Sequence, residues 1–423
     1  MDDRKIIGFC LEFYRMTKED NRVIPVDEFL CFDGIPYCHK NTYRKIVAGE
    51  NEKKEMYFGL LQQLQMKYEM EEQFYPKLLI LHEQLKHAVE QVDRKQLIVV
   101  LSQIKDMLTK KENVYPYQIN RYLVDCLERF IVFDEVWNNH CVKVLLMISR
   151  VCDTPMRLLL NYYLYQNCHR SKRKESSLKK MSEQLLVSDH EELLNQLILM
   201  RQMIYEQEFT LAEHLAECAE KICLASGNQN RMVEVLQCQI AIYGVTGREE
   251  QAKDCLSKLE QLMKEESLDP IVVKQCQYYL GMHHYSEHNF VYAGPFLKQQ
   301  IQGKKPNKNN CFLFLFYESV LNYERKKDPE IGYSEVDLQN LDSTQRRFLQ
   351  YFLYQRANKS RNYLVSYIMK RILPLLNSDH AMEAYVFLQE LYLLKAKEEA
   401  KIMKQRMTEL NYVIQHSWEK SFS

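Results

Sequence analysis

Glycine and proline are scarce in this chain. The 423 residues include 11 glycines and 10 prolines, whereas average usage would give roughly 30 glycines in a chain of this length. A fold rich in turns and strands needs more of both residues, so we predict an all-α protein. With 46% hydrophobic residues the chain can bury a large core, and its length suggests two or three domains.

Net charge and long apolar runs are also absent. Lys and Arg number 57, and so do Asp and Glu, which excludes a protein that coats nucleic acid or an acidic membrane by bulk electrostatics. The longest apolar run, 311–317, is too short to cross a bilayer. No apolar signal core follows the first five residues. We therefore expect a cytoplasmic protein with no membrane partner.

Paired cysteine motifs are missing too. None of the 13 cysteines forms a C-x-x-C pair, which argues against zinc ribbons and thioredoxin-like chemistry. Most lie at apolar positions of helical patterns, where a free thiol behaves as a small hydrophobe. This usage is typical of a reducing compartment.

Motifs for catalysis are lacking as well. The chain contains no G-x-x-x-x-G-K-[ST], G-x-G-x-x-G, G-x-S-x-G or H-E-x-x-H sequence. His283, His284 and His288 include an i, i+4 pair, but no acidic or thiol ligand accompanies it. We interpret them as surface-helix histidines. We expect no enzyme, no metal and no cofactor.

A basic segment at 37–49 is the most informative stretch that is present. No acidic residue falls between Asp33 and Glu50. Tyr43 and Ile46 lie three residues apart, so one face of a helix here can dock on a core while the other points donors outward. This arrangement suits a recognition helix, and the alternative is a solvated basic helix. The outward donors are His39, Lys40, Asn41, Arg44 and Lys45.

Helical patterns flank this segment. Residues 7–15 place Ile7, Leu11 and Tyr14 on one face, and residues 52–66 carry a similar apolar face. A unit of about 65 residues is therefore expected to contain at least three short helices, with the basic one in the middle.

The pattern resembles the helix-turn-helix of the lambda-repressor/Cro (XRE) type, in the form that heads peptide-pheromone regulators such as Rgg and PlcR, the RNPP family. The resemblance covers residues 5–68. The first-helix motif I-G-x-x-[IL]-x-x-x-R is matched by Ile7, Gly8, Leu11 and Arg15. The third-helix motif C-S-x-x-T-[YL]-x-[RK]-I-x-x-G is matched by Cys38, Thr42, Tyr43, Lys45, Ile46 and Gly49.

The chain departs from that family at several positions. The stretch 24–30, at the place of the second helix, lacks the Gln that clamps a phosphate, and Val47 stands where a Glu is usual. Residues 1–50 hold eight Lys or Arg and nine Asp or Glu. Because phosphate neutralisation dominates non-specific affinity, a monomer should bind DNA weakly and a dimer is needed. A degenerate domain that no longer binds DNA is the alternative.

Beyond residue 70 the chain is predicted to be helix after helix. Ala212, Ala252 and Ala293 each open a helix after a tyrosine, at intervals of 40 and 41 residues. Small residues at such places let paired helices approach closely in tetratricopeptide (TPR) repeats. We predict a helix-turn-helix domain at 1–70 and a TPR-like helical-repeat solenoid at 71–423. The basic run 170–180, interpreted as an exposed helix or loop rather than a phosphate site, marks an internal boundary near 170–185.

A solenoid presents a concave groove that suits an extended peptide or a partner helix. Asparagine and glutamine amides can hold a peptide backbone, and tyrosines supply rigid contact area. An ordinary structural role is the alternative for each residue. The candidates are Asn161, Tyr165, Asn195, Gln202, Gln239, Tyr278, Tyr279 and Asn322.

These features together favour a DNA-binding transcriptional regulator. The resemblance implies a homodimer that acts in quorum sensing, with a short signal peptide or protein partner in the groove and two heads on DNA half-sites. Lys40, Asn41 and Arg44 would reach base edges, with Thr42 beside them, while His39, Lys45 and Arg15 would serve phosphates or positioning. The alternatives are a protein-binding adaptor resembling the Rap regulators, and a scaffold with a degenerate head.

Overall fold

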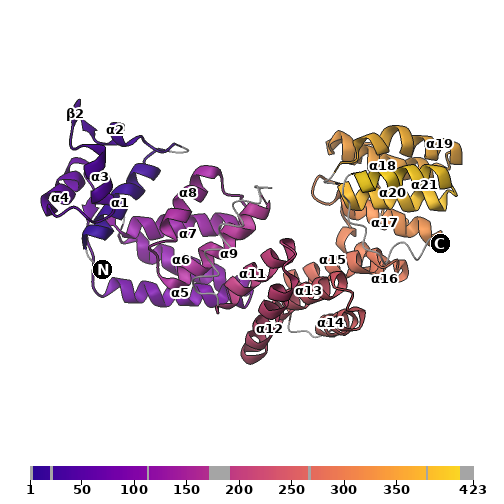
Figure 1. The fold of residues 1–423 in the computed structure, drawn as a ribbon, viewed down its shortest axis with the longest axis horizontal. Coiled ribbons are helices and arrows are strands. Elements are labelled where there is room, and N and C mark those ends of the chain that lie inside the picture. The colour runs from indigo at the N-terminus through magenta and orange to yellow at the C-terminus, as the bar shows by residue number, and fades with distance from the viewer. Residues whose placement is uncertain are drawn as a thin grey trace. The chain divides into compact units, whose positions relative to one another are not determined.

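Helices dominate the structure, a computed structural model that describes residues 3–19, 22–111, 114–170, 191–264, 268–377 and 380–409 (Figure 1). In these residues the chain is all-α apart from four strands of two residues each. It forms two compact units, Met1–Lys258 and Leu259–Ser423. No helix in the described ranges combines the length and the apolar character needed to cross a membrane.

The first unit begins with a small head and continues as a series of helices. The head contains α1 (Asp3–Thr17), α2 (Val26–Phe29), β1 (Cys31–Phe32), β2 (Ile35–Pro36), α3 (Lys40–Val47), α4 (Lys54–Gln63) and β3 (Lys67–Tyr68). The body contains α5 (Phe74–Glu90), α6 (Arg94–Thr109), β4 (Val114–Tyr115), α7 (Tyr117–Ile131), α8 (Asn139–Ile148), α9 (Thr154–Arg170), α11 (Leu193–Tyr205), α12 (Phe209–Ser226), α13 (Gln229–Val245) and α14 (Glu249–Leu262), which crosses the unit boundary.

The head is joined to the body by pairing and by aromatic packing. Strand β3 pairs in parallel with β4, with Tyr68 opposite Tyr115. From α1, the Phe13 ring packs edge-on against Tyr122 of α7 at 5.5 Å, and Tyr14 packs against Tyr115 at 6.3 Å. Residues on both sides of the predicted boundary at 70 therefore belong to one compact unit.

Helical hairpins recur with a common turn. The pairs α11/α12, α13/α14 and α15/α16 each have a residue in the left-handed region between the two helices, at Gln207, Gly247 and His288. The amide of the next residue bonds back to the first helix at 2.8 Å in all three, as in a Schellman motif. These turns are 40 and 41 residues apart, the same spacing as the alanines. Ala212 and Ala293 are fully buried.

Three polar side chains at the start of α13 close the end of α5. The Asn228 amide donates to Glu90 O at 2.8 Å, and the Asn230 amide donates to Gln91 O at 2.8 Å. The fully buried Arg231 guanidinium donates to Val89 O at 2.6 Å and Glu90 O at 3.1 Å. Helix ends leave carbonyls without intrahelical partners, and here residues about 140 positions away supply them. We call this contact the α5–α13 clasp.

The second unit is a separate helical core. It contains α15 (Pro270–Ser286), α16 (Phe290–Ile301), α17 (Cys311–Tyr323), the 3₁₀ turn η1 (Asp337–Asn340), α18 (Ser343–Arg356), α19 (Arg361–Tyr367), the π-helical turn η2 (Ile368–Ile372), the 3₁₀ turn η3 (Leu373–Leu375), α20 (Ala381–Leu393) and α21 (Lys397–Glu409). Polar groups are enclosed in it: Glu318 is buried beside Arg356, and Glu390 is buried among Asn322, Tyr351 and Gln355.

Candidate nucleic-acid interface

Helix α3 has one buried and one exposed face, as its sequence predicts. Tyr43 and Ile46 are completely enclosed where α3 packs against α1 (Figure 1). The opposite face exposes Lys40, Asn41, Arg44 and Lys45, with Thr42 half-buried between the two. The donors predicted to reach DNA therefore share one solvent-facing surface, which we call the α3 basic face.

Glycine allows α1 to approach the backbone of α3. A Cβ built on Gly8 would lie 2.2 Å from Ile46 O and 2.9 Å from Val47 O, so no other residue fits without moving one helix. Gly49 ends α3 with φ of +75°. Its amide bonds to Ile46 O at 2.9 Å and that of Glu50 to Lys45 O at 2.8 Å, which is a Schellman cap. The two motif glycines therefore have separate roles. Gly8 allows α1 and α3 to pack closely, and Gly49 ends α3.

A polar network on α1 binds the buried face of α3. The Tyr43 hydroxyl donates to Glu12 Oε2 at 3.0 Å, and Arg15 Nε donates to the same oxygen at 2.9 Å. Arg15 also donates to Ile24 O. Burial, followed by the neighbouring Glu12 carboxylate, raises the pKa of Tyr43 well above its ordinary value. The Arg15 guanidinium is occupied inside the head, so its place is in positioning α3 rather than on the α3 basic face.

The N-terminal end of α3 is capped by histidine. The His39 imidazole accepts a hydrogen bond through Nδ1 from the amide of Asn41, at 3.2 Å. A neutral imidazole that accepts at Nδ1 carries its proton at Nε2. Because His39 is exposed, this Nε2–H is a further donor beside Lys40 and Asn41.

The connection that precedes α3 differs from a tight helix-turn-helix. Helix α2 is a single turn of four residues, and ten residues separate it from α3. These residues include a hairpin of β1 and β2, turned at Asp33 and Gly34 with positive φ. Tyr37 anchors the hairpin by donating to Met56 O at 3.3 Å. A helix-turn-helix joins its helices by three or four residues, so α3 is presented here by a hairpin instead.

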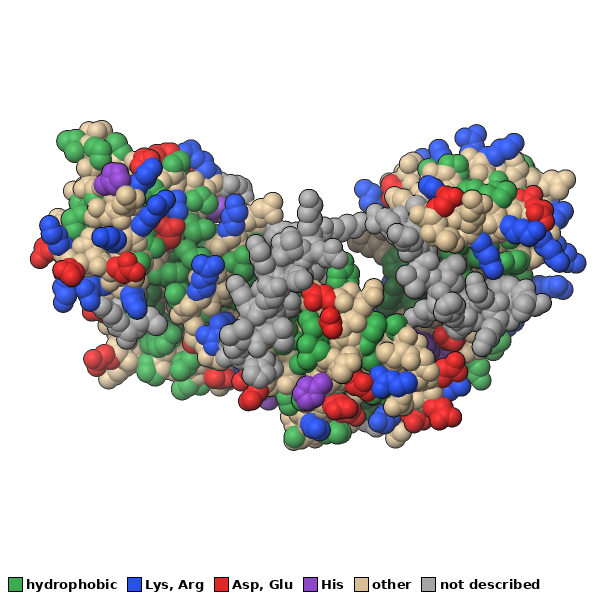
Figure 2. All heavy atoms as spheres, viewed as in Figure 1, with side chains coloured by type: hydrophobic (Ala, Val, Ile, Leu, Met, Phe, Trp, Pro, Cys, Tyr) green, Lys and Arg blue, Asp and Glu red, His purple; other side chains and the backbone are tan. Residues whose placement is uncertain are grey.

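The cations of the α3 basic face form no ion pairs among the residues that the structure describes. Across the described ranges, no carboxylate forms an ion pair with Lys40, Arg44 or Lys45. Figure 2 shows Lys and Arg side chains over the N-terminal helices, with acidic side chains interspersed. The positive charge is therefore a local feature of one helix, consistent with the balanced composition of residues 1–50.

The predicted peptide-binding residues do not share one surface. Tyr165, Asn195, Gln202 and Gln239 are buried among α9, α11 and α13. The Gln202 amide donates to Glu206 at the end of its own helix at 2.8 Å, and the Gln239 amide of α13 donates to Glu220 of α12 at 2.7 Å. Both amides are therefore engaged within the helical packing rather than exposed in a groove. Of the others, Asn161 is half-buried in the same unit.

The remaining candidates lie in the second unit. Tyr278 is 38% exposed and packs edge-on against Phe312. Tyr279 stacks on His283. The Asn322 amide donates to both oxygens of Glu390 at 3.3 Å and to Gln355, so it belongs to the buried polar network.

The three histidines interpreted above as surface-helix residues are not on the surface: His284 is buried, and His283 and His288 are half-buried. His284 Nε2 lies 3.4 Å from Glu260 Oε1, and His288 Nε2 lies 2.7 Å from the Tyr385 hydroxyl. Burial lowers the pKa of His283 to about 4. Within the described part of the chain, no three His, Cys, Asp or Glu side chains are placed to hold a metal ion. The basic run 171–180 lies outside the described residues.

Comparison with known proteins places this chain in no family: no family model, no curated protein and no solved structure matches it.

Proposed function

We propose that this protein binds double-stranded DNA through the α3 basic face. The observation that supports the proposal is that α3 has two different faces. Tyr43 and Ile46 fix the helix in the head, while Lys40, Asn41 and Arg44 face solvent and Lys40 and Arg44 pair with no carboxylate in the described part of the chain. Arg and Lys can contact guanine O6 and N7 or phosphates, and Asn can contact adenine N6 and N7. On this proposal Lys45 and His39 contact the DNA backbone.

The proposed regulator acts as a homodimer. One α3 has few cations, and the N-terminal residues carry no net positive charge, so a single head offers little phosphate neutralisation. Two copies would place two α3 helices on half-sites about one helical turn apart. The helical hairpins of the body would bind a short peptide or protein partner that favours one spacing of the heads. The repeated turns at Gln207 and Gly247 in the first unit support successive helical hairpins for that role.

Selection from random double-stranded DNA tests the proposal. The full chain is compared with the variant Lys40→Ala/Arg44→Ala and with the control Arg94→Ala/Lys95→Ala, which removes the same two charges from an exposed turn of α6. We expect the full chain and the control to enrich a palindromic site that the α3 variant does not. On that site, the α3 variant should reduce the slope of log affinity against log salt by about 1 to 2.

Two results would refute DNA recognition by α3. One is equal enrichment by the full chain and the α3 variant, and the other is equal loss in the α3 variant and the α6 control. If a folded full chain enriches no site at any salt concentration, the protein-binding adaptor becomes the better proposal. Affinity capture with the α3 variant would then recover the same protein partner as the full chain.

A further inference from the structure

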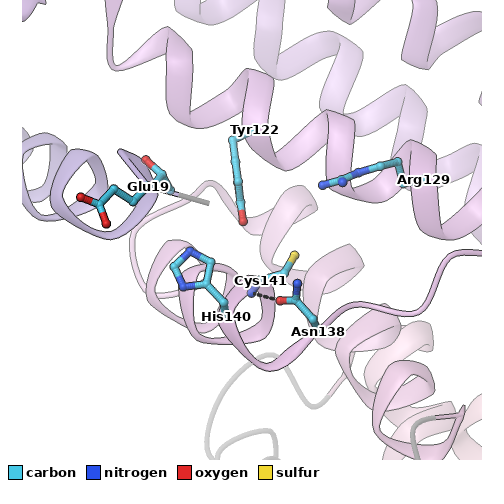
Figure 3. A pocket seen from close by; sticks show the side chains of 7 residues that line it. Glu19, Tyr122, Arg129, Asn138, His140 and Cys141 are labelled. Atoms are coloured by element: carbon cyan, nitrogen blue, oxygen red, sulfur yellow. Dashed lines mark hydrogen bonds between the residues drawn. The ribbon is translucent and has the colours of Figure 1, made fainter. Parts of the chain in front are cut away.

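A polar cavity of about 420 Å³ lies in the first unit, where the end of α1 meets α7 and the start of α8 (Figure 3). Pockets that hold small molecules commonly start at roughly 300 Å³. The cavity is separate from the α3 basic face and lies beside the Phe13–Tyr122 contact between the head and the body. Its lining residues are Thr17, Glu19, Tyr122, Arg129, Asn138, His140 and Cys141.

The cationic group of this cavity is Arg129, and the nearby Glu135 carboxylate contributes to raising its pKa. The Arg129 guanidinium extends toward Tyr122 (Figure 3) and lies 3.6 Å from the Cys126 sulfur. No carboxylate in the described ranges pairs with it. The one acidic residue in the lining, Glu19, points away from Tyr122 and pairs with Arg22 at 3.4 Å. The cavity therefore offers a planar cationic fork whose natural partner is a carboxylate or a phosphate.

The other lining groups can complete an anion site. The Tyr122 hydroxyl points toward the start of α8, where His140 lies (Figure 3), and both groups can donate hydrogen bonds. The Asn138 side chain caps α8 by accepting from the Cys141 amide at 2.8 Å. The cavity thus opens onto the first turn of a ten-residue helix, whose dipole adds to the positive potential.

The cavity joins the head to the body. Thr17 belongs to the last turn of α1, and its hydroxyl donates to Phe13 O at 2.8 Å. Phe13 packs in turn on Tyr122. A ligand that contacts Thr17 and Tyr122 together would hold the end of α1 against α7 and α8.

We propose that this cavity binds a small organic anion, with its carboxylate or phosphate held by Arg129 and its neighbouring oxygens by Tyr122 and His140. The bound anion rigidifies the last turn of α1 and the first turn of α8. The site stands independently of DNA binding, because it uses none of the residues of the α3 basic face.

Calorimetric titration of the full chain in chloride buffer at low ionic strength tests the site. The phosphate probes are pyrophosphate and adenosine 5′-monophosphate, the carboxylate probe is citrate, and adenosine is the uncharged control. The variant Arg129→Gln is compared with Arg150→Gln, which removes the same charge from an exposed position just after α8. Circular dichroism verifies that both variants fold.

We expect at least one anionic probe to bind saturably with a submillimolar Kd, while adenosine does not bind. Arg129→Gln should weaken that binding at least tenfold, since charge-assisted bidentate contacts are the strong ones, and Arg150→Gln should leave it unchanged. Binding by the phosphates alone would identify a phosphate site, and binding by citrate alone a carboxylate site.

Amide hydrogen exchange gives a second readout. The bound probe should slow exchange at 13–17 and 139–142 in the full chain and have no such effect in Arg129→Gln. Absence of saturable binding by all anionic probes would overturn the proposal. So would equal affinity in Arg129→Gln and the full chain, or exchange protection elsewhere only.

Discussion

Glu390 makes the stability of the second unit depend on pH. Its carboxylate is fully buried and accepts from the Asn322 amide at 3.3 Å and the Tyr351 hydroxyl at 3.1 Å. Burial raises the pKa of Glu390 to about 7, by more than these donors lower it. At a pH between these two pKa values, Glu390 is protonated in the folded state and ionised in the unfolded chain, where its pKa is the ordinary 4.5. The free energy of unfolding must fall as pH rises between these two values.

The size of this effect follows from linkage. For these two pKa values, raising the pH from about 5.5 to about 8 lowers the free energy of unfolding by roughly 2 kcal/mol. Histidines in the same unit act in the opposite direction: burial lowers the pKa of His283 and of His288, so their neutral forms add stability above the ordinary histidine pKa and lose it as pH falls. The wild-type profile contains both effects, and only a comparison with a Glu390 variant separates them.

The variant Glu390→Gln keeps the shape of the protonated acid and removes its titration. We expect it to match the wild type near pH 5.5 and to exceed it by roughly 2 kcal/mol near pH 8. The measurement is urea unfolding at each pH, followed by pulsed hydrogen exchange at 381–393. Glu335→Gln is the control, because Glu335 is exposed and its substitution should give no pH-dependent difference. Parallel profiles for the wild type and Glu390→Gln would refute the reasoning.

Three further substitutions test how the first unit is held together. Gly8→Ala should destabilise the head by about 1–3 kcal/mol, because its new methyl meets the backbone of α3. Gly244→Ala, in α13 with open space around it, should instead stabilise by up to about 1 kcal/mol; urea unfolding that gives both the same sign would contradict the close approach. Arg231→Met removes one of the two cations that pair with the largely enclosed Glu234 and should destabilise by about 3–5 kcal/mol. The rate of amide hydrogen exchange at the end of α5 should increase in Arg231→Met. An unchanged rate there would show that the α5–α13 clasp does not hold α5.

The sequence predicts those features whose signal is local. The three-residue spacing of Tyr43 and Ile46 is enough to show which face of α3 is buried, and the scarcity of glycine and proline is enough to predict helices. The alanines at 40- and 41-residue intervals mark real helical hairpins, because each follows a left-handed turn at the same offset. Residues close together in the sequence determine these signals, so they can be recognised in a single sequence.

Other features depend on contacts that one sequence does not show. The short hairpin at 31–36 is inserted between the second helix and α3, and its two strands are too brief for an alternating pattern. Asn195 and Gln202 look like groove residues in an apolar helix but are enclosed by neighbouring helices. Arg129 and His140 meet at a cavity only because α7 and α8 pack together, and no spacing in the sequence marks them.

The α5–α13 clasp can form only after the ribosome has synthesised the start of α13. Arg231 follows its carbonyl partner on Glu90 by 141 residues, and ribosomes add about 5–20 residues per second. The carbonyls of Glu90 and Gln91 are therefore without their α13 donors for roughly 7–28 s. During that time the N-terminal helices have been synthesised, but the first unit lacks the helices that complete its packing. Slowing translation between these positions should prolong the interval in which nascent chains bind chaperones.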